Sequence, residues 1–185
     1  MTNRITNYSL RLVKILESHC WDNVECLSRE MLDIWQSQRQ MFLCGNGGSA
    51  ANAMHMANDF LYGIGNGETN GMKVEALTAN SSVLTCLAND EGYEDIFSIQ
   101  LKTKASAGDL LLVLSGSGDS ENIVRALQVG KNIGMVTYAI VGLSGGRCVG
   151  ESQNVIHFSN ADMQLAEDLQ LIVGHMCMQA LRMEH

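Results

Sequence analysis

Residues Asp109 to Leu114 are the feature that most constrains how this chain can fold. They read DLLLVL, and a continuous apolar run of this length is typical of a strand that is buried on both faces. Strands of this kind occur in parallel sheets that helices cover on both sides. The rest of the chain must therefore supply further strands and two layers of helices.

Apolar patterns along the chain alternate between strand and helix. Strands are expected at residues 41–44, 72–77, 109–114, 135–141 and 155–158. Helices are expected at residues 3–18, 21–38, 49–62, 81–88, 93–104, 121–133 and 161–183, and a loop at 63–71. This alternation predicts one α/β domain over residues 1–185, in which a parallel sheet lies between helical layers. The hydrophobic content of 46% is sufficient for a core.

Charge and cysteine usage exclude several classes of function. The net charge of −8 gives an acidic surface, which disfavours direct binding to nucleic acid. No apolar run approaches the roughly 18 residues of a membrane span, and no signal peptide opens the chain. The six cysteines lie mostly in apolar runs without CxxC spacing, so we expect buried thiols in a cytoplasmic protein.

Two loops share the order strand, Gly/Ser loop, helix. They are Gly45 to Ser49 (GNGGS) and Ser115 to Ser120 (SGSGDS). Glycines let backbone N–H groups approach a ligand, and a helix N-terminus favours an anion such as phosphate. No Lys or Arg lies in the second loop, so neutral donors are expected to hold the anion. Either loop alone also fits an ordinary capped turn, and neither has the Walker or GxGxxG spacing.

Longer motifs surround these loops. They are GNGGSAANAMH (Gly45 to His55), LTANSSVLTCLANDEGYEDIF (Leu77 to Phe97), GDLLLVLSGSGDSENI (Gly108 to Ile123) and the stretch from Ala161 to His175. In order and spacing they resemble the phosphoheptose isomerase branch of the sugar isomerase (SIS) family, over about residues 1–183.

The resemblance implies a three-layer SIS fold with a five-stranded parallel sheet and an N-terminal helical pair at residues 1–38 that serves oligomerisation. It implies a homotetramer with active sites between subunits. The implied reaction converts sedoheptulose 7-phosphate to a D-glycero-heptose 7-phosphate through an enediol, for heptose and surface-glycan biosynthesis. Several members of the branch bind zinc in the site, so zinc is the implied cofactor.

The resemblance also assigns residues. Asp59 and His175 match catalytic positions, and the implied metal ligands are His55, Asp59, Glu167 and His175. The implied substrate-binding residues are Asn46, Gly47, Gly48, Ser49, Asn80, Asn89, Ser115, Gly116, Ser117, Ser120 and Glu167. Taken singly, His55 also fits a satisfied core histidine, Asp59 a solvated surface residue and His175 a surface histidine.

Helical spacing supports part of this site. His55 and Asp59 are spaced i, i+4, which puts an imidazole and a carboxylate on one helix face. Such a pair suits proton transfer or zinc binding. Glu167 and His175 are eight residues apart, about 12 Å along a helix, so one ion could reach both only if they stretch or come from different chains. Asp168 shares a face with His175 more readily.

Several positions depart from the family pattern, and they cluster at the implied site. The chain has Asp59 for Glu, Gly63 for Arg, Asn80 for Asp, Gly116 for Thr, Asp119 for Asn, Glu167 for Gln and Asp168 for His. These changes leave two alternatives to the heptose isomerase. One is a non-catalytic SIS protein that associates with the replication initiator. The other is an isomerase or binder for a different sugar phosphate.

Overall fold

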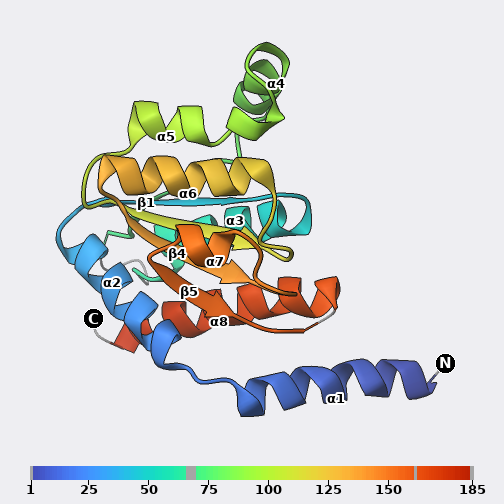
Figure 1. Ribbon diagram of the computed structural model, residues 1–185. Helices are drawn as coiled ribbons and strands as arrows, with labels where there is room; N and C mark the ends of the chain where they lie inside the picture. The colour runs from blue at the N-terminus through green and yellow to red at the C-terminus, as the bar shows by residue number, and fades with distance from the viewer. Residues whose placement is uncertain (1, 66–69, 161, 184–185) are drawn as a thin grey trace.

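In the computed structural model, which describes residues 2–65, 70–160 and 162–183, five strands form one parallel sheet (Figure 1). The strands are β1 (Gln40–Gly45), β2 (Lys73–Ala76), β3 (Leu110–Ser115), β4 (Val136–Val141) and β5 (Asn154–His157). They lie in the order β2-β1-β3-β4-β5, and all neighbours are parallel. The predicted five-stranded parallel sheet is therefore confirmed.

Helices cover both faces of this sheet. They are α1 (Thr2–Ser18), α2 (Asp22–Gln36), α3 (Gly48–Asn58), α4 (Ser81–Asp90), α5 (Ser98–Lys104), α6 (Glu121–Ile133), α7 (Cys148–Glu151) and α8 (Met163–Met183). In Figure 1, α5 and α6 lie above the sheet and α2 and α8 below it. This arrangement confirms the three-layer α/β fold and the N-terminal helical pair.

The central strand β3 shows why the sheet needs two helical layers. All six of its residues are buried. Leu110, Leu112 and Leu114 pack into one core with residues of α2, α3 and α8. Leu111 and Val113 pack into the other core with residues of α5 and α6. Successive side chains of a strand point to opposite faces, so an unbroken apolar run fills both cores.

The strand order places the two Gly/Ser loops next to each other. From β1 the chain crosses to β2 on one side, and the strands β3, β4 and β5 continue on the other side. The topology therefore reverses between the neighbours β1 and β3. Ligands of open α/β sheets bind at the carboxyl ends of the strands at such a reversal. Both glycine-rich loops begin there, since one follows β1 and the other follows β3.

Two predicted helices are interrupted. The helix expected up to residue 62 ends at Asn58 and continues as one π-helical turn, η1 (Asp59–Gly63), closed by a bond from Ile64 N–H to the Asp59 carbonyl (3.1 Å). The helix expected at 93–104 is a 3₁₀ turn, η2 (Tyr93–Asp95), followed by α5. The Ser98 hydroxyl there donates to the Asp95 carboxylate (2.6 Å), and local bonds of this kind favour a turn over a helix.

The helix expected from residue 161 begins at Met163, where the Asp162 carboxylate accepts the N–H groups of Gln164 (3.0 Å) and Leu165 (3.2 Å). Residue 161 itself and residues 66–69 of the predicted loop lie outside the described residues. Within the described segments, no helix combines the length and apolarity that crossing a membrane requires.

The prediction of buried cysteines is wrong for half of them. Cys44, Cys148 and Cys177 are buried, whereas Cys20, Cys26 and Cys86 are exposed. All six carry free thiols. The exposed ones lie near the α1–α2 turn and on α4, where neighbouring apolar residues suggested burial but only one face of the helix meets the core.

Candidate active site

The first glycine-rich loop turns the chain sharply from β1 into α3. Gly47 has a positive φ of 55°, which favours glycine. At Gly45 a Cβ atom would lie 2.6 Å from the Ser49 carbonyl oxygen, so the close passage of the backbone also requires glycine. Ser49 is buried in the first turn of α3. The free N–H groups of this turn therefore face the edge where β1 ends.

The second loop leaves three hydroxyl groups able to donate. Ser115 Oγ accepts the Gly118 N–H (3.0 Å), and Ser117 Oγ accepts the Asp119 N–H (3.3 Å). A hydroxyl that accepts one bond still has its hydrogen to donate. Ser120 is the N-cap of α6, and its side chain makes no capping bond to that helix. The loop thus offers hydroxyl donors and a helix N-terminus to an anion.

The two loops are joined by a pair of amide side chains. Asn46 and Asn122 exchange two hydrogen bonds of 2.9 Å, one in each direction. The Tyr93 hydroxyl donates to Asn46 Oδ1 (3.0 Å). Asn46 was predicted to bind substrate, but its side chain forms the hydrogen bonds that hold the loops together. Asn122 and Tyr93 were not predicted, because partners in three separate segments leave no spacing signal.

Helices α3 and α8 lie side by side and contact each other at several positions. Near the start of both helices, a Cβ at Gly48 would overlap the Glu167 carboxylate (2.3 Å from Oε1). One turn on, Asn52 Nδ2 donates to the Glu167 carbonyl (2.9 Å) and to Gln170 Oε1 (3.0 Å). Further along, Gly174 lets Met56 pack directly against the α8 backbone. These contacts fix the register of α8 on α3.

This register brings three predicted residues together. His55 Nε2 and His175 Nε2 are 3.0 Å apart, and each lies 3.4 Å from Asp59 Oδ2. The two imidazoles are about half exposed, while the Asp59 side chain is 17% exposed. Two imidazoles that share one carboxylate can hold and relay a proton between them. The cluster lies seven residues after Gly48 on α3, about 10 Å along the helix from the glycine-rich loop.

The cluster also fits a zinc ion. Atoms that bind one tetrahedral zinc at about 2.0–2.1 Å lie about 3.3 Å from one another. The edges of the cluster, 3.0, 3.4 and 3.4 Å, are of this size. Two imidazole nitrogens and a carboxylate oxygen are donors that zinc takes, and three protein ligands leave a fourth position for substrate. Among the described residues, these three form the group able to hold a metal ion.

Glu167 and Asp168 do not join this cluster. The Glu167 carboxylate lies against Gly48, at the loop end of α3. Asp168 accepts a 2.6 Å hydrogen bond from the Tyr8 hydroxyl of α1, and the pKa of Tyr8 is raised to about 12 by burial and by this carboxylate. Within one chain, the predicted four-ligand set is therefore reduced to three residues. The 12 Å helical separation between Glu167 and His175 is the reason.

Asn80 directly precedes α4 and Asn89 lies near its end, and Figure 1 shows α4 at the top, away from α8 at the bottom. Asn80 Oδ1 caps α4 by accepting the Val83 N–H (3.1 Å). Asn89 Nδ2 donates to Asp90 Oδ1 (2.7 Å). The structure of one chain does not bring either amide to the histidine cluster.

A guanidinium group lies beside Gly63, where the family pattern has an arginine. Arg182, near the end of α8, donates from Nε (2.8 Å) and Nη2 (2.6 Å) to the Gly63 carbonyl. This clasp joins α8 to the π-helical turn that begins with Asp59. A second cation, Arg147, approaches the second glycine-rich loop through Asp119. Arg147 is not part of the loop itself, so the expectation that neutral donors hold the anion stays a prediction.

The buried cysteines take no part in this chemistry. Burial raises the pKa of the Cys177 thiol, two residues from His175, to about 12. Burial likewise raises the pKa of Cys148 to about 12. A thiol with such a pKa stays protonated near neutral pH and is neither a nucleophile nor a ready metal ligand.

Comparisons with known proteins agree with this architecture. The SIS domain family profile matches residues 6–142. The phosphoheptose isomerase of Akkermansia muciniphila is 34% identical over 173 residues, which cover 92% of this chain and 89% of that one. That of Aneurinibacillus thermoaerophilus is 32% identical over 152 residues, covering 82% and 76% of the two chains.

Among solved structures, the phosphoheptose isomerase of Neisseria gonorrhoeae superposes with a TM-score of 0.89 at 24% identity and covers 97% of both chains. The enzyme of Francisella tularensis gives a TM-score of 0.88 at 22% identity, again with 97% of both chains covered. At these identities the superpositions establish the shared fold, including the N-terminal helical pair.

Proposed function

Because the chain belongs to the SIS-domain family, we propose that it is a sugar-phosphate aldose–ketose isomerase that converts sedoheptulose 7-phosphate to a D-glycero-heptose 7-phosphate. The relatives that match most of its length are phosphoheptose isomerases. The product would serve heptose and surface-glycan biosynthesis. The six free thiols suit the reducing cytoplasm, which is the compartment we expect.

The observation that carries this proposal is the cluster of His55, Asp59 and His175, in which α3, the helix that starts at a phosphate-type loop, and its π-helical continuation meet α8. Isomerisation moves a proton between neighbouring carbons through an enediol. One group must take the carbon-bound proton, and another must protonate the adjacent oxygen. In our proposal Asp59 and His175 share these roles, and His55 fixes them through its contacts of 3.4 and 3.0 Å.

The other end of the substrate would bind at the glycine-rich loops. Ser115, Ser117 and Ser120 would donate hydroxyl bonds to the phosphate, and the amides of Gly47 to Ser49 would add backbone donors. The roughly 10 Å between this loop and the cluster suits an extended sugar phosphate whose reacting carbons lie far from its phosphate. Glu167, at Gly48, would contact the sugar between these two ends.

Zinc is the metal that we propose for the cluster, with His55, Asp59 and His175 as its ligands. When bound, such an ion supplies a Lewis acid that stabilises the negative charge of an enediolate oxygen. Asp59 and the two histidines would then hold the ion through the same atoms that face one another in its absence, so they would not share a proton while the ion is bound.

We further propose a homotetramer in which α1 and α2 make subunit contacts. Helix α1 exposes Ile5 (73%) and Leu10 (62%). An apolar groove of about 570 Å³ lies between α2 and α8, lined by Trp21 and Leu181 among others. The half-exposed histidine pair also suits a site that a second copy of the chain completes.

The test is NMR-monitored incubation of the protein with sedoheptulose 7-phosphate, with added zinc and with a chelator. An aldoheptose 7-phosphate should form, and His175→Ala should abolish its formation without lowering the melting temperature. A normal rate in this variant would contradict the assigned roles. No product in any sample, together with binding of the sugar phosphate, would point to the second alternative, a different substrate.

One observation favours that second alternative. A Cβ at Gly116 would lie 2.0 Å from the Met163 sulfur, so Met163 occupies space that a larger loop residue would need. This contact reshapes the loop region relative to the family pattern. Thermal stabilisation by a panel of sugar phosphates measures the consequence, since a ligand that binds the native state raises the melting temperature. The initiator-associated reading is less well supported, because the histidine pair is retained.

A further inference from the structure

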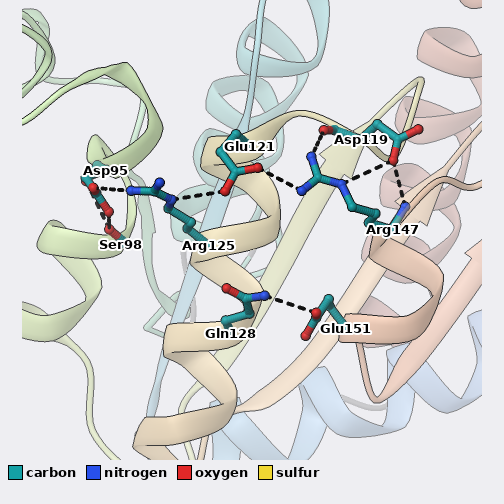
Figure 2. Close-up of polar contacts among 8 residues, drawn as sticks. All are labelled: Asp95, Ser98, Asp119, Glu121, Arg125, Gln128, Arg147 and Glu151. Carbon is teal, nitrogen blue, oxygen red and sulfur yellow. Dashed lines mark hydrogen bonds and ion pairs between the residues drawn. The ribbon is translucent and has the colours of Figure 1, made fainter.

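A row of alternating charges crosses the outside of the second glycine-rich loop (Figure 2). It runs from the cap of α5, along the first turn of α6, to the turn that precedes α7. Its members are Asp95, Arg125, Glu121, Arg147 and Asp119. Arg125 Nε binds Glu121 Oε1 (3.1 Å), and Arg147 Nη1 binds Glu121 Oε2 (2.7 Å). These two arginines lower the pKa of Glu121, which stays ionised.

Arg147 is the last cation of this row, and it binds Asp119 within the loop. Its backbone N–H donates to Asp119 Oδ1 (2.9 Å), and its Nε lies 3.5 Å from the same oxygen. Its Nη2 donates to the Asp119 backbone carbonyl. One residue thus holds both the carboxylate and the main chain of Asp119, and Figure 2 shows the guanidinium between Asp119 and Glu121.

The turn that carries Arg147 is packed tightly on the loop. A Cβ at Gly118 would lie 2.0 Å from the Gly145 carbonyl oxygen, and one at Gly146 would lie 2.5 Å from the Gly118 carbonyl carbon. The Cys148 N–H donates to the Gly118 carbonyl (2.9 Å). The loop and the turn therefore form one backbone unit, and the Arg147 side chain closes it on the solvent side.

Asp119 creates an electrostatic problem for a phosphate loop. A carboxylate beside a helix N-terminus competes with an anionic ligand for the same positive potential. Its charge would also repel a phosphate directly. The hydroxyls of Ser115 and Ser117, in contrast, keep a hydrogen to donate, as described above. The loop can bind phosphate only if the Asp119 charge is neutralised and held aside.

We propose that Arg147 is a positioning residue for phosphate recognition, which acts by neutralising Asp119 and holding its carboxylate outside the loop. The inference rests on the proposed function, since it takes Ser115 to Ser120 as the phosphate site. Arg147 does not need to touch the substrate. It removes a repulsion that the sequence of this chain introduces at Asp119.

The experiment compares Arg147→Gln, Asp119→Asn and the double variant. With sedoheptulose 7-phosphate, Arg147→Gln should raise KM about tenfold and leave kcat within about twofold, because only anion binding is weakened. Asp119→Asn alone should lower KM about twofold, and adding it to Arg147→Gln should restore KM to near the wild-type value. Arg125→Gln is the matched control, since Arg125 lies in the same row but touches no loop residue.

The wild type, the three variants and the Arg125→Gln control are also titrated with inorganic phosphate by calorimetry, which needs no turnover. An unchanged affinity in Arg147→Gln would overturn the proposal. So would a loss that Asp119→Asn fails to restore, because Arg147 would then act on the phosphate directly or on the fold. Equal melting temperatures establish that the variants are folded, and Arg147→Lys, which keeps the charge, should lie between wild type and Arg147→Gln. Phosphate binding without isomerisation would contradict only the proposed reaction. Absence of phosphate binding would contradict both the proposed reaction and the proposed role of Arg147.

Discussion

Three side chains from two helices meet at the candidate reaction centre, and their unequal exposure separates their roles. His55 and His175 are half exposed, so a substrate can reach them. Asp59 is mostly covered and faces both imidazoles at 3.4 Å. A carboxylate in this position can accept a hydrogen bond from either ring and completes the metal-binding group. In our proposal, Asp59 is therefore the residue on which both proton transfer and metal binding depend.

Replacing Asp59 by Asn should reduce kcat at least about 100-fold, because a positioned acid or base contributes that much or more to the rate. Zinc affinity should fall in parallel, while the melting temperature stays close to that of the wild type. Steady-state kinetics, zinc titration and a thermal melt measure the three effects. Asp33→Asn, an exposed carboxylate change on α2, serves as the control. Retained zinc affinity in Asp59→Asn would remove Asp59 from the ligand set.

The sequence predicted part of this centre for a physical reason. His55 and Asp59 share a face because their spacing matches the helix period. The approach of His175 depends on contacts between helices that lie more than a hundred residues apart, such as Asn52 with Gln170, and no local pattern encodes them. The family resemblance supplied that residue instead. Glu167 is about 12 Å from His175 along α8, and its place at Gly48 emerges only from the packed helices.

At the scale of elements, the packing of α8 on α3 carries the site. Gly174 precedes His175 and is the point of closest approach, where a Cβ would lie 2.7 Å from Met56 Cε and 3.0 Å from Cγ. Interiors are packed too densely to absorb such a change freely. A larger residue at position 174 must therefore push the helices apart and separate the two histidines.

Gly174→Val should lower the free energy of unfolding by about 1–3 kcal/mol, the usual cost of an overpacked core. Turnover should fall with it, because the 3.0 Å contact between the imidazoles is lost. Urea denaturation and the isomerase assay measure both effects. Gly150→Val is the control, since a Cβ at Gly150 meets nothing within 4 Å. Equal losses in the two variants would mean that helix propensity, not the α3–α8 contact, accounts for the change.

The turn between α1 and α2 contains a histidine that should make stability depend on pH. His19 stacks on Phe158 and meets Trp21 edge to face. Burial, and to a lesser extent the charge of His157, lowers the pKa of His19 below its ordinary value of 6.5. The unfolded chain therefore binds a proton at a higher pH than the folded chain. The stability that His19 contributes is therefore complete above its ordinary pKa of 6.5, and it is lost as the pH falls from there through the lowered pKa of the folded state.

His19→Phe keeps the ring packing and removes the titration. Its free energy of unfolding should decline less steeply than that of the wild type between about pH 7 and pH 5. Urea melts across that range give the two slopes. Parallel slopes would show that His19 titrates alike in the folded and unfolded states.

Element boundaries show where local sequence rules stop. The apolar pattern of α3 continues through Phe60, so the sequence predicts a longer helix, yet the chain changes to a π-helical turn at Asp59. Such turns insert one residue into the helical repeat and are frequent at functional sites. The spacing of apolar residues along the sequence does not reveal a single inserted residue. The strands, in contrast, were predicted to within about one residue at each end, and for β1, β3 and β4 the reason is burial on both faces, which leaves continuous apolar runs.

At the scale of the whole molecule, the sheet order brings the two glycine-rich loops to one edge. Alternation of strands and helices predicts a parallel sheet, but it does not state on which side of β1 each later strand adds. The contact between Asn46 and Asn122 depends on that order. The surface of the molecule also carries uncovered apolar area in two places, on α1 at Ile5 and Leu10 and in the groove between α2 and α8.

The double substitution Ile5→Glu and Leu10→Glu should shift the proposed tetramer to smaller species, because charges replace apolar area that the proposed subunit contacts would bury. Light scattering coupled to gel filtration measures the mass. Turnover should fall if neighbouring chains complete the site. Lys14→Glu, a change of charge at an exposed position of the same helix, is the control. An unaltered mass in the double variant would exclude α1 from the interface.

The clasp between Arg182 and the Gly63 carbonyl has a practical meaning for anyone who handles this protein. It ties the closing turn of α8 to the π-helical turn that presents Asp59. Truncation of α8 before Arg182 removes this contact, so we expect it to change the position of the Asp59 carboxylate, although the two residues lie far apart in sequence. Rates measured on two preparations should therefore be compared only when both contain the whole of α8.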